Sequence, residues 1–200
     1  MEKGSLMKFI TYYTPKYAAC AKMLMADCNY LKLDLIAEPL EDFKDWQQAT
    51  RFKATFIGAY LNKLNEDICF IDADARIRKD PVLIKELSSA NYDIAAVYFK
   101  NIELLSGTLW MANTSTVKDI IQDWIKLNID PRKSRGVEQQ NLQVTLDKYP
   151  AIRFLRLPPE YAAIFDLSRL FYKEIEPVVE HFQRSRQIRK EETLSQNRRT

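Results

Sequence analysis

Short apolar runs alternate along the chain with segments whose apolar residues recur every three or four positions. The first pattern is typical of buried strands and the second of amphipathic helices. The expected strands are 7–13, 33–37, 68–71, 94–99, 104–112 (interrupted at Gly107) and 152–155, and the expected helices are about 16–29, 42–64, 81–87, 115–127 and 137–149. A last apolar segment covers 177–182. This alternation predicts a single α/β domain with a mixed central sheet flanked by helices.

The expected helix 42–64 carries a lysine on its apolar side. Lys53 falls between Ala49 and Phe56, on the stripe that also contains Trp46. A lysine in this position either extends past its neighbours to solvent or, alone or with Arg51, meets a phosphate at the carboxyl edge of the sheet. The pattern favours neither interpretation.

Two further polar residues occupy apolar surroundings. Glu138 begins the inward face of helix 137–149, which continues with Leu142 and Leu146. It either stabilises the helix N-terminus or points into a cleft. His181 is the only histidine of the chain and ends the last apolar segment. It is either structural or, as a neutral imidazole, a ligand for Mn²⁺ beside carboxylates.

The triplet Asp72-Ala73-Asp74 follows directly after the buried strand 68–71. Ligands of open α/β sheets bind beyond the carboxyl ends of the strands. Carboxylates at such a place suit Mg²⁺ or Mn²⁺, which commonly take one or two of them together with substrate phosphates. Because an Asp-x-Asp triplet also arises about once by chance in a chain of this length, the alternative is a solvated turn.

Composition excludes several classes of protein. The four glycines, Gly4, Gly58, Gly107 and Gly136, cannot form either of the common glycine-rich phosphate loops. The net charge of +3 is too small to indicate nucleic-acid binding, and the three cysteines lack metal-binding spacing. The sequence has neither an apolar run of about 20 residues nor a signal peptide. We therefore expect a cytoplasmic protein without a membrane span, or host-cytoplasmic if phage-encoded.

The ends of the chain differ from its centre. Residues 1–6 are expected to be a leader or a cloning remnant, because Met7 could equally start the protein. Residues 183–200 are rich in Lys and Arg and almost lack large apolar side chains, so they are expected to form a basic, partly disordered tail. The predicted catalytic domain is therefore 7–182.

These features occur in the order found in GT-A glycosyltransferases, and residues 7–190 resemble a compact bacterial or phage member of the nucleotide-diphospho-sugar transferase superfamily. Four segments carry the resemblance: Arg51-Phe52-Lys53 with the D-x-D stretch 68–77 and Asp80-Pro81; 105–110; Glu138-Gln139-Gln140 with 155–161; and 181–186. At 200 residues the chain is shorter than typical members. The acceptor-binding part is therefore expected to be minimal or supplied by a partner.

The resemblance implies a retaining transferase that uses Mn²⁺ or Mg²⁺ to move a sugar from a UDP- or GDP-sugar donor to an acceptor hydroxyl. It implies that Asp72, Asp74 and His181 bind the metal, that Thr11, Tyr12 and Tyr13 contact the nucleoside, that Lys53 and Arg186 neutralise phosphate, and that Glu138 or Gln139 lies near the anomeric carbon. Arg51, Ala73, Ser106 and Gly107 complete the expected donor site.

Three other functions were weighed against this one. A sugar-nucleotide nucleotidyltransferase needs a glycine-rich loop after the first strand, where this chain has residues 11–15 without glycine. A non-catalytic nucleic-acid-binding protein could use the basic tail and aromatic residues. A phage-type enzyme could glycosylate hydroxymethylated pyrimidines in DNA, with the tail and Arg132, Lys133 and Arg135 on phosphates. The acceptor is left open, with modified DNA among the possibilities.

Overall fold

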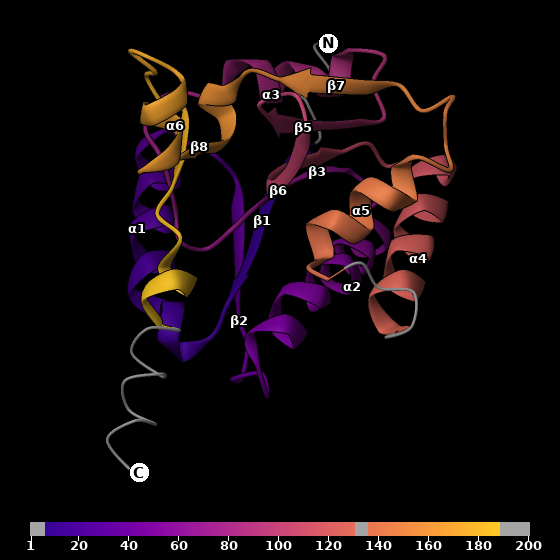
Figure 1. Ribbon diagram of the computed structural model, residues 1–200, viewed down its shortest axis with the longest axis horizontal. Coiled ribbons are helices and arrows are strands. Elements are labelled where there is room, and N and C mark those ends of the chain that lie inside the picture. The colour runs from indigo at the N-terminus through magenta and orange to yellow at the C-terminus, as the bar shows by residue number, and fades with distance from the viewer. Residues whose placement is uncertain (1–6, 131–135, 189–200) are drawn as a thin grey trace.

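The computed structural model describes residues 7–130 and 136–188, which are built around a six-stranded mixed sheet (Figure 1). The strands are β1 Met7–Tyr13, β2 Leu35–Pro39, β3 Asp67–Ile71, β5 Ile94–Phe99, β6 Glu103–Met111 and β7 Phe154–Leu157, in the order β2-β1-β3-β6-β5-β7. β1 is parallel to β2 and β3, β5 is parallel to β7, and β6 is antiparallel to both neighbours. The predicted α/β class with a mixed sheet is confirmed. The carboxyl ends of five strands therefore meet at one edge.

Helices cover both faces of this sheet (Figure 1). The helix α1, Ala18–Tyr30, packs on one face, and α2 Trp46–Leu64, α4 Ser115–Ile129 and α5 Glu138–Leu146 pack on the other. Alternation along β1 divides the core accordingly, since Phe9 belongs to the cluster with α1 and Ile10 to the cluster with α2. The short helix α3, Val82–Glu86, joins the α1 side through Ile84.

The helix α2 begins four residues later than the apolar spacing predicts. The side chain of Asp45 accepts a hydrogen bond of 2.8 Å from the Gln48 amide and caps the helix. Phe43 therefore lies outside the helix, where its ring contacts Phe52 and Tyr12. The strands β2 and β7 also begin two residues later than expected, and α5 ends at Leu146. These shifts leave the predicted order of elements unchanged.

A second, three-stranded sheet was not predicted from the sequence. It consists of β4 Ala75–Ile77, β8 Ala163–Ile164 and β9 Val179–His181 in the order β4-β9-β8. The short helix α6, Leu167–Phe171, follows β8. Strands of two or three residues are too short to show a period. Their pairing matters for the site, because Ala75, one residue after Asp74, lies opposite His181.

Three segments named in the sequence analysis are not described by the structure. They are residues 1–6, the internal segment with Arg132, Lys133 and Arg135, and the basic residues after 188. Residues 183–188 continue from β9, and Gln183, Ser185 and Arg186 line the same cavity as the D-x-D triplet. Among residues 7–130 and 136–188, no helix combines the length and apolarity needed to cross a membrane.

Candidate active site

A cavity of about 950 Å³ opens at the sheet edge where the carboxyl ends of the strands meet. Its walls come from the ends of β1 and β3, the beginning of β6, the helices α2 and α5, and the residues around β9. Of the residues proposed from the sequence, the cavity is lined by Tyr12, Tyr13, Lys53, Asp72, Ala73, Asp74, Ser106, Gly107, Glu138, Gln139, His181 and Arg186. The fold therefore brings residues from the whole length of the domain to one place.

Two residues of the expected donor site lie elsewhere. Thr11 is fully buried inside β1, two residues before the strand ends, and is not part of the cavity wall. Arg51 is two residues from Lys53 on α2 and therefore about 200° away around the helix. Its guanidinium donates to the Gly136 carbonyl at 3.2 Å, and it lines a smaller neighbouring pocket.

Asp72, Asp74 and His181 bring three potential ligand atoms within 4.8 Å of one another. The turn after β3 creates this arrangement. The Asp72 amide donates to the Gly107 carbonyl at 2.8 Å, and the Ala75 amide donates to the Asp72 carbonyl at 3.0 Å. The pairing of β4 with β9 then places His181 beside the two carboxylates.

The His181 ring is held in the neutral state. Burial, together with the nearby charge of Lys53, lowers the pKa of His181 to about 3. Its Nε2 lies 2.9 Å from the Thr108 hydroxyl oxygen. In the tautomer that donates this hydrogen bond from Nε2, the Nδ1 lone pair is available to a cation. Thr108 was missed in the sequence, where its only signal is a polar position two residues after Ser106.

The three side chains fit a divalent cation. Two carboxylates and a neutral imidazole form a donor set suited to Mn²⁺. Ligands that share an ion at about 2.1 Å lie at most about 4.2 Å apart, so small side-chain shifts would close this cluster around one. Burial and the charge of Asp72 raise the pKa of Asp74 to about 6. The Arg184 amide donates to Asp74 at 2.7 Å and lowers this pKa, but by less than the other two effects raise it. A bound cation would relieve this repulsion.

Position 107, next to this cluster, has no room for a side chain. A β-carbon added there would lie 2.7 Å from Cε1 of His181 and 3.0 Å from Oδ2 of Asp72. A methyl group would therefore displace both His181 and Asp72.

Gly107→Ala is therefore expected to weaken Mn²⁺ binding about 10-fold or more, the range seen when the groups that orient metal ligands are changed. Titration calorimetry with Mn²⁺ checks this. Gly58→Ala is the matched control, because a β-carbon there meets Ile121 at 3.0 Å in the core and touches no ligand. Equal Mn²⁺ affinity in wild type and Gly107→Ala would contradict the assignment.

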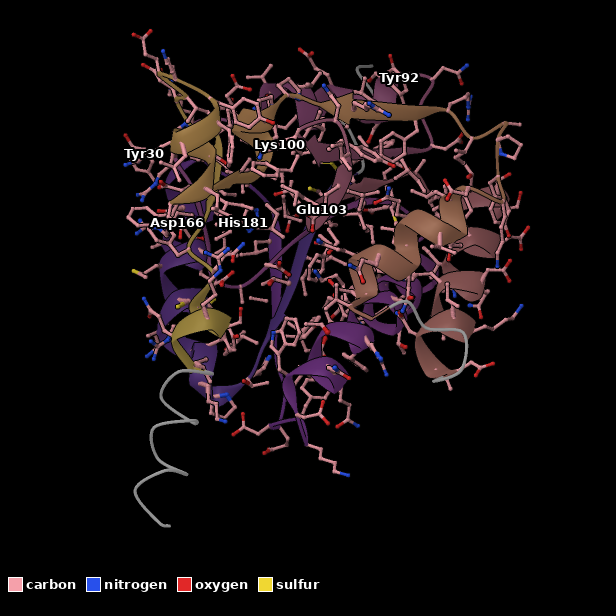
Figure 2. The ribbon with its side chains drawn as sticks, viewed as in Figure 1. Tyr30, Tyr92, Lys100, Glu103, Asp166 and His181 are labelled. Carbon is pink, nitrogen blue, oxygen red and sulfur yellow. The ribbon has the colours of Figure 1, made fainter. Side chains whose placement is uncertain are left out.

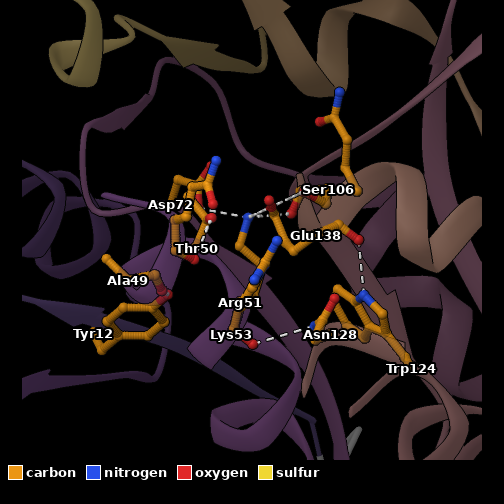
Figure 3. A network of polar contacts seen from close by, with 12 residues as sticks. Tyr12, Ala49, Thr50, Arg51, Lys53, Asp72, Ser106, Trp124, Asn128 and Glu138 are labelled. Carbon is orange, nitrogen blue, oxygen red and sulfur yellow. Dashed lines mark hydrogen bonds and ion pairs between the residues drawn. The ribbon is translucent and has the colours of Figure 1, made fainter. Parts of the chain in front are cut away.

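Lys53 occupies the centre of a buried polar network (Figure 3). Its Nζ lies 3.0 Å from Asp72 Oδ1 and 3.0 Å from Glu138 Oε1, and it donates to the Ser106 hydroxyl at 3.1 Å. The Ser106 hydroxyl donates to Glu138 at 2.7 Å. Burial acts to lower the pKa of Lys53, but the carboxylates of Asp72 and Glu138 outweigh it, so the pKa is raised. The lysine is thus charged and does not extend to solvent.

Glu138 stands at the start of α5 with its side chain in the cavity, which is the second of the two roles considered from the sequence. It is the first residue of α5, and its backbone carbonyl accepts a hydrogen bond of 2.8 Å from the Trp124 indole. Its side chain points to the network around Lys53 and lines the cavity. The neighbouring Gln139 also lines the cavity and donates to Glu103 at 2.6 Å.

Aromatic residues and one arginine complete the walls. The Tyr12 hydroxyl donates to the Ala49 carbonyl at 2.6 Å, and its ring packs 5.0 Å from that of Phe56. Burial raises the pKa of Tyr12, which stays a neutral donor. Arg186 also lines the cavity, and its guanidinium pairs with Asp166 at 2.9 Å on the surface.

Comparison with known proteins identifies the fold. No protein-family model matches the chain, and no curated protein matches its sequence. A solved glycosyltransferase involved in the glycosylation of the major capsid of PBCV-1 superposes with a TM-score of 0.65 at 14% identity, covering 88% of this chain and 94% of that one. The chain has the GT-A glycosyltransferase fold.

Two more solved structures share the GT-A fold with this chain. The glycosyltransferase GlyE of Streptococcus pneumoniae gives a TM-score of 0.63 at 14% identity, covering 89% of this chain and 55% of GlyE. Mouse xyloside xylosyltransferase 1 gives 0.57 at 9% identity, covering 88% and 97%. This chain thus spans about half of GlyE. At these sequence identities the three solved structures show that the chain shares their fold.

Proposed function

We propose that the protein is a metal-dependent glycosyltransferase that moves a sugar from a nucleoside-diphosphate donor to an acceptor hydroxyl. The observation that carries the proposal is the convergence of Asp72, Asp74 and His181 inside a large cavity at the carboxyl edge of the sheet. Ligands of open α/β sheets bind at this edge. The GT-A fold adds support, because its solved neighbours are glycosyltransferases.

The order of the strands supports a direction for the donor along the cavity. At the sheet edge, β1 is followed by β3 and then by β6. The β1 end is lined by Tyr13 and, from the segment before and at the start of α2, by Phe43 and Trp46. Aromatic walls of this kind suit a flat nucleobase of a UDP- or GDP-sugar. The diphosphate would then lie at β3, beside Asp72, and the sugar at β6, beside Ser106.

Charge stabilisation at the diphosphate is the main chemical task. Sugar transfer leaves negative charge on the departing nucleoside diphosphate, and a bound Mn²⁺ or Mg²⁺ supplies positive charge there. Arg186 is placed to add to it. Its partner Asp166 lies on the surface, where such a pair contributes at most about 1 kcal/mol. The guanidinium therefore exchanges this contact for a phosphate at little cost.

Lys53 and Glu138 act next to the sugar. Lys53 shares its charge between Asp72 and Glu138, so it fixes the position of a metal ligand and of a cavity carboxylate together. The carboxylate of Glu138, held by Lys53 and Ser106, would stabilise positive charge that develops at the anomeric carbon. We propose that the transfer retains the anomeric configuration, and the H1 coupling constant of the product in NMR tests this.

The proposal is tested by donor turnover. Incubation with Mn²⁺ and a panel of UDP- and GDP-sugars is expected to release the nucleoside diphosphate from one donor, with a rise in melting temperature on binding it. Excess EDTA is expected to abolish the release, and excess Mn²⁺ to restore it. Full turnover in EDTA would contradict the metal role. Binding to random DNA without turnover of any donor would favour a nucleic-acid-binding protein instead.

A further inference from the structure

The end of the cavity beyond the proposed sugar position has a different chemical character. There, next to β5, the walls are apolar and are formed by Phe99, Leu105, Ile164 and Leu167. Two polar residues, Gln139 and Glu103, also line this end, where Gln139 donates to Glu103 at 2.6 Å. With the donor lying along β1, β3 and β6, this is the end from which an acceptor hydroxyl reaches the anomeric carbon.

The apolar surface continues from this end onto the outside of the protein along α6. Leu167 lines the cavity, and Leu170 and Phe171 follow it three and four positions later, on the same side of the helix. Their exposed fractions are 75% and 49%. Three apolar side chains thus form a stripe that begins inside the cavity and ends in solvent.

Contacts with the turn between β5 and β6 join this stripe to the cavity wall a second time. The rings of Phe171 and Phe99 meet edge to face at 5.5 Å, and Lys100 Nζ lies 3.3 Å from the centre of the Phe171 ring. Figure 2 labels Lys100 and Glu103, the two charged residues of this turn region. The surface is therefore continuous, with polar groups at its inner end and at one side.

We propose that this surface, which we call the α6 stripe (Leu167, Leu170 and Phe171), binds the apolar part of an amphiphilic acceptor. The acceptor is a sugar whose hydroxyls meet Glu103 and Gln139 and whose alkyl or aryl aglycone covers the stripe. Exposed apolar residues are ordinary when they are single, but here they extend the wall of the reaction cavity. The negative charge of Glu103, at the inner end of this surface, disfavours a phosphodiester backbone there. The inference rests on the proposed function.

A series of acceptors with growing chains tests the inference. Methyl, butyl, hexyl and octyl glycosides of glucose, galactose and xylose are offered with the donor that the protein turns over, below their micelle concentrations. A fully buried methylene contributes about fourfold in affinity, and a half-buried one about twofold. We therefore expect KM to fall about two- to fourfold for each methylene added. Calorimetric binding of the octyl glycosides measures the same effect without turnover.

Two variants identify the surface that is responsible. Leu170→Ser is expected to raise KM for the octyl glycoside at least about fivefold and to leave the methyl glycoside unchanged. Ile129→Ser is the matched control, because Ile129 is likewise an apolar residue, 73% exposed, at the end of α4. This variant is expected to leave KM unchanged for both the octyl and the methyl glycoside.

Other outcomes overturn the inference and leave the proposed function distinguishable from it. Two results would exclude the α6 stripe as the aglycone site and leave the transferase proposal intact. One is donor turnover with a KM that does not depend on chain length. The other is donor turnover together with octyl glycosides that bind the Leu170→Ser variant as tightly as the wild type. Sedimentation showing a dimer that Leu170→Ser dissociates makes the stripe a self-association surface instead. Failure of every donor to turn over contradicts the proposed function, and the calorimetric comparison still decides the stripe.

Discussion

Asp74→Asn is expected to lower sugar transfer by a factor of about 10³ or more while the fold stays intact. Asp74 is one of two carboxylates in the metal cluster. A unit charge about 4 Å from another contributes roughly 4 kcal/mol at an effective dielectric constant of 20, and that free energy corresponds to about three powers of ten in rate. Initial rates with the turned-over donor at saturating Mn²⁺, alongside calorimetric Mn²⁺ affinity, measure the loss.

Stability separates this functional loss from unfolding. Burial and the charge of Asp72 raise the pKa of Asp74 to about 6, so the ionised side chain costs free energy in the metal-free folded state at neutral pH. The metal-free Asp74→Asn protein should therefore melt at or above the wild-type temperature. Asp80→Asn, which removes a surface carboxylate paired with Lys85, is expected to keep full activity. Near-wild-type rates for Asp74→Asn would remove Asp74 from the metal site.

The order of helices and strands was predictable because each element carries its own periodic signal. The run 68–71 predicted β3, and the spacing of 42–64 predicted α2, although the Asp45 cap moved its start to Trp46. The small sheet was not predictable, since β4 and β9 are three residues long and pair across about 100 positions of sequence. What holds them is tertiary, as when Arg76 of β4 donates twice to Asp27 of α1.

Part of the site was predictable, because a charged residue next to an apolar segment, or directly after a buried strand, is expected at the sheet edge where ligands bind. Asp72 and Glu138 stood out as charges next to apolar segments, and the fold brings both into one cavity. The partners of Lys53 were not predictable, because they come from three separate places, namely the turn after β3, the strand β6 and the helix α5. Arg51 shows the opposite case. The 200° between it and Lys53 on a helix already argued against their acting together.

Lys53→Met is expected to destabilise the protein by about 3–5 kcal/mol, because it removes the only cation contacting the buried Glu138 among the described residues and leaves that carboxylate uncompensated. Asp72 loses the same partner, but its side chain is partly exposed and keeps water. Urea unfolding monitored by circular dichroism gives the free energy, and an unchanged midpoint would contradict the network's role. Transfer is expected to fall with stability, since Asp72 and Glu138 are no longer held.

The double variant Lys53→Met, Glu138→Gln distinguishes charge compensation from packing. A neutral amide at position 138 can still accept the hydrogen bond from Ser106 and needs no cation, so most of the lost stability should return. Glu138→Gln alone leaves Lys53 paired with Asp72 and is expected to cost only about 1 kcal/mol. Activity should stay low in the double variant, because the lysine that orients a metal ligand is still missing. A double variant as unstable as Lys53→Met would show that the aliphatic packing of Lys53, and not its charge, stabilises this part of the core.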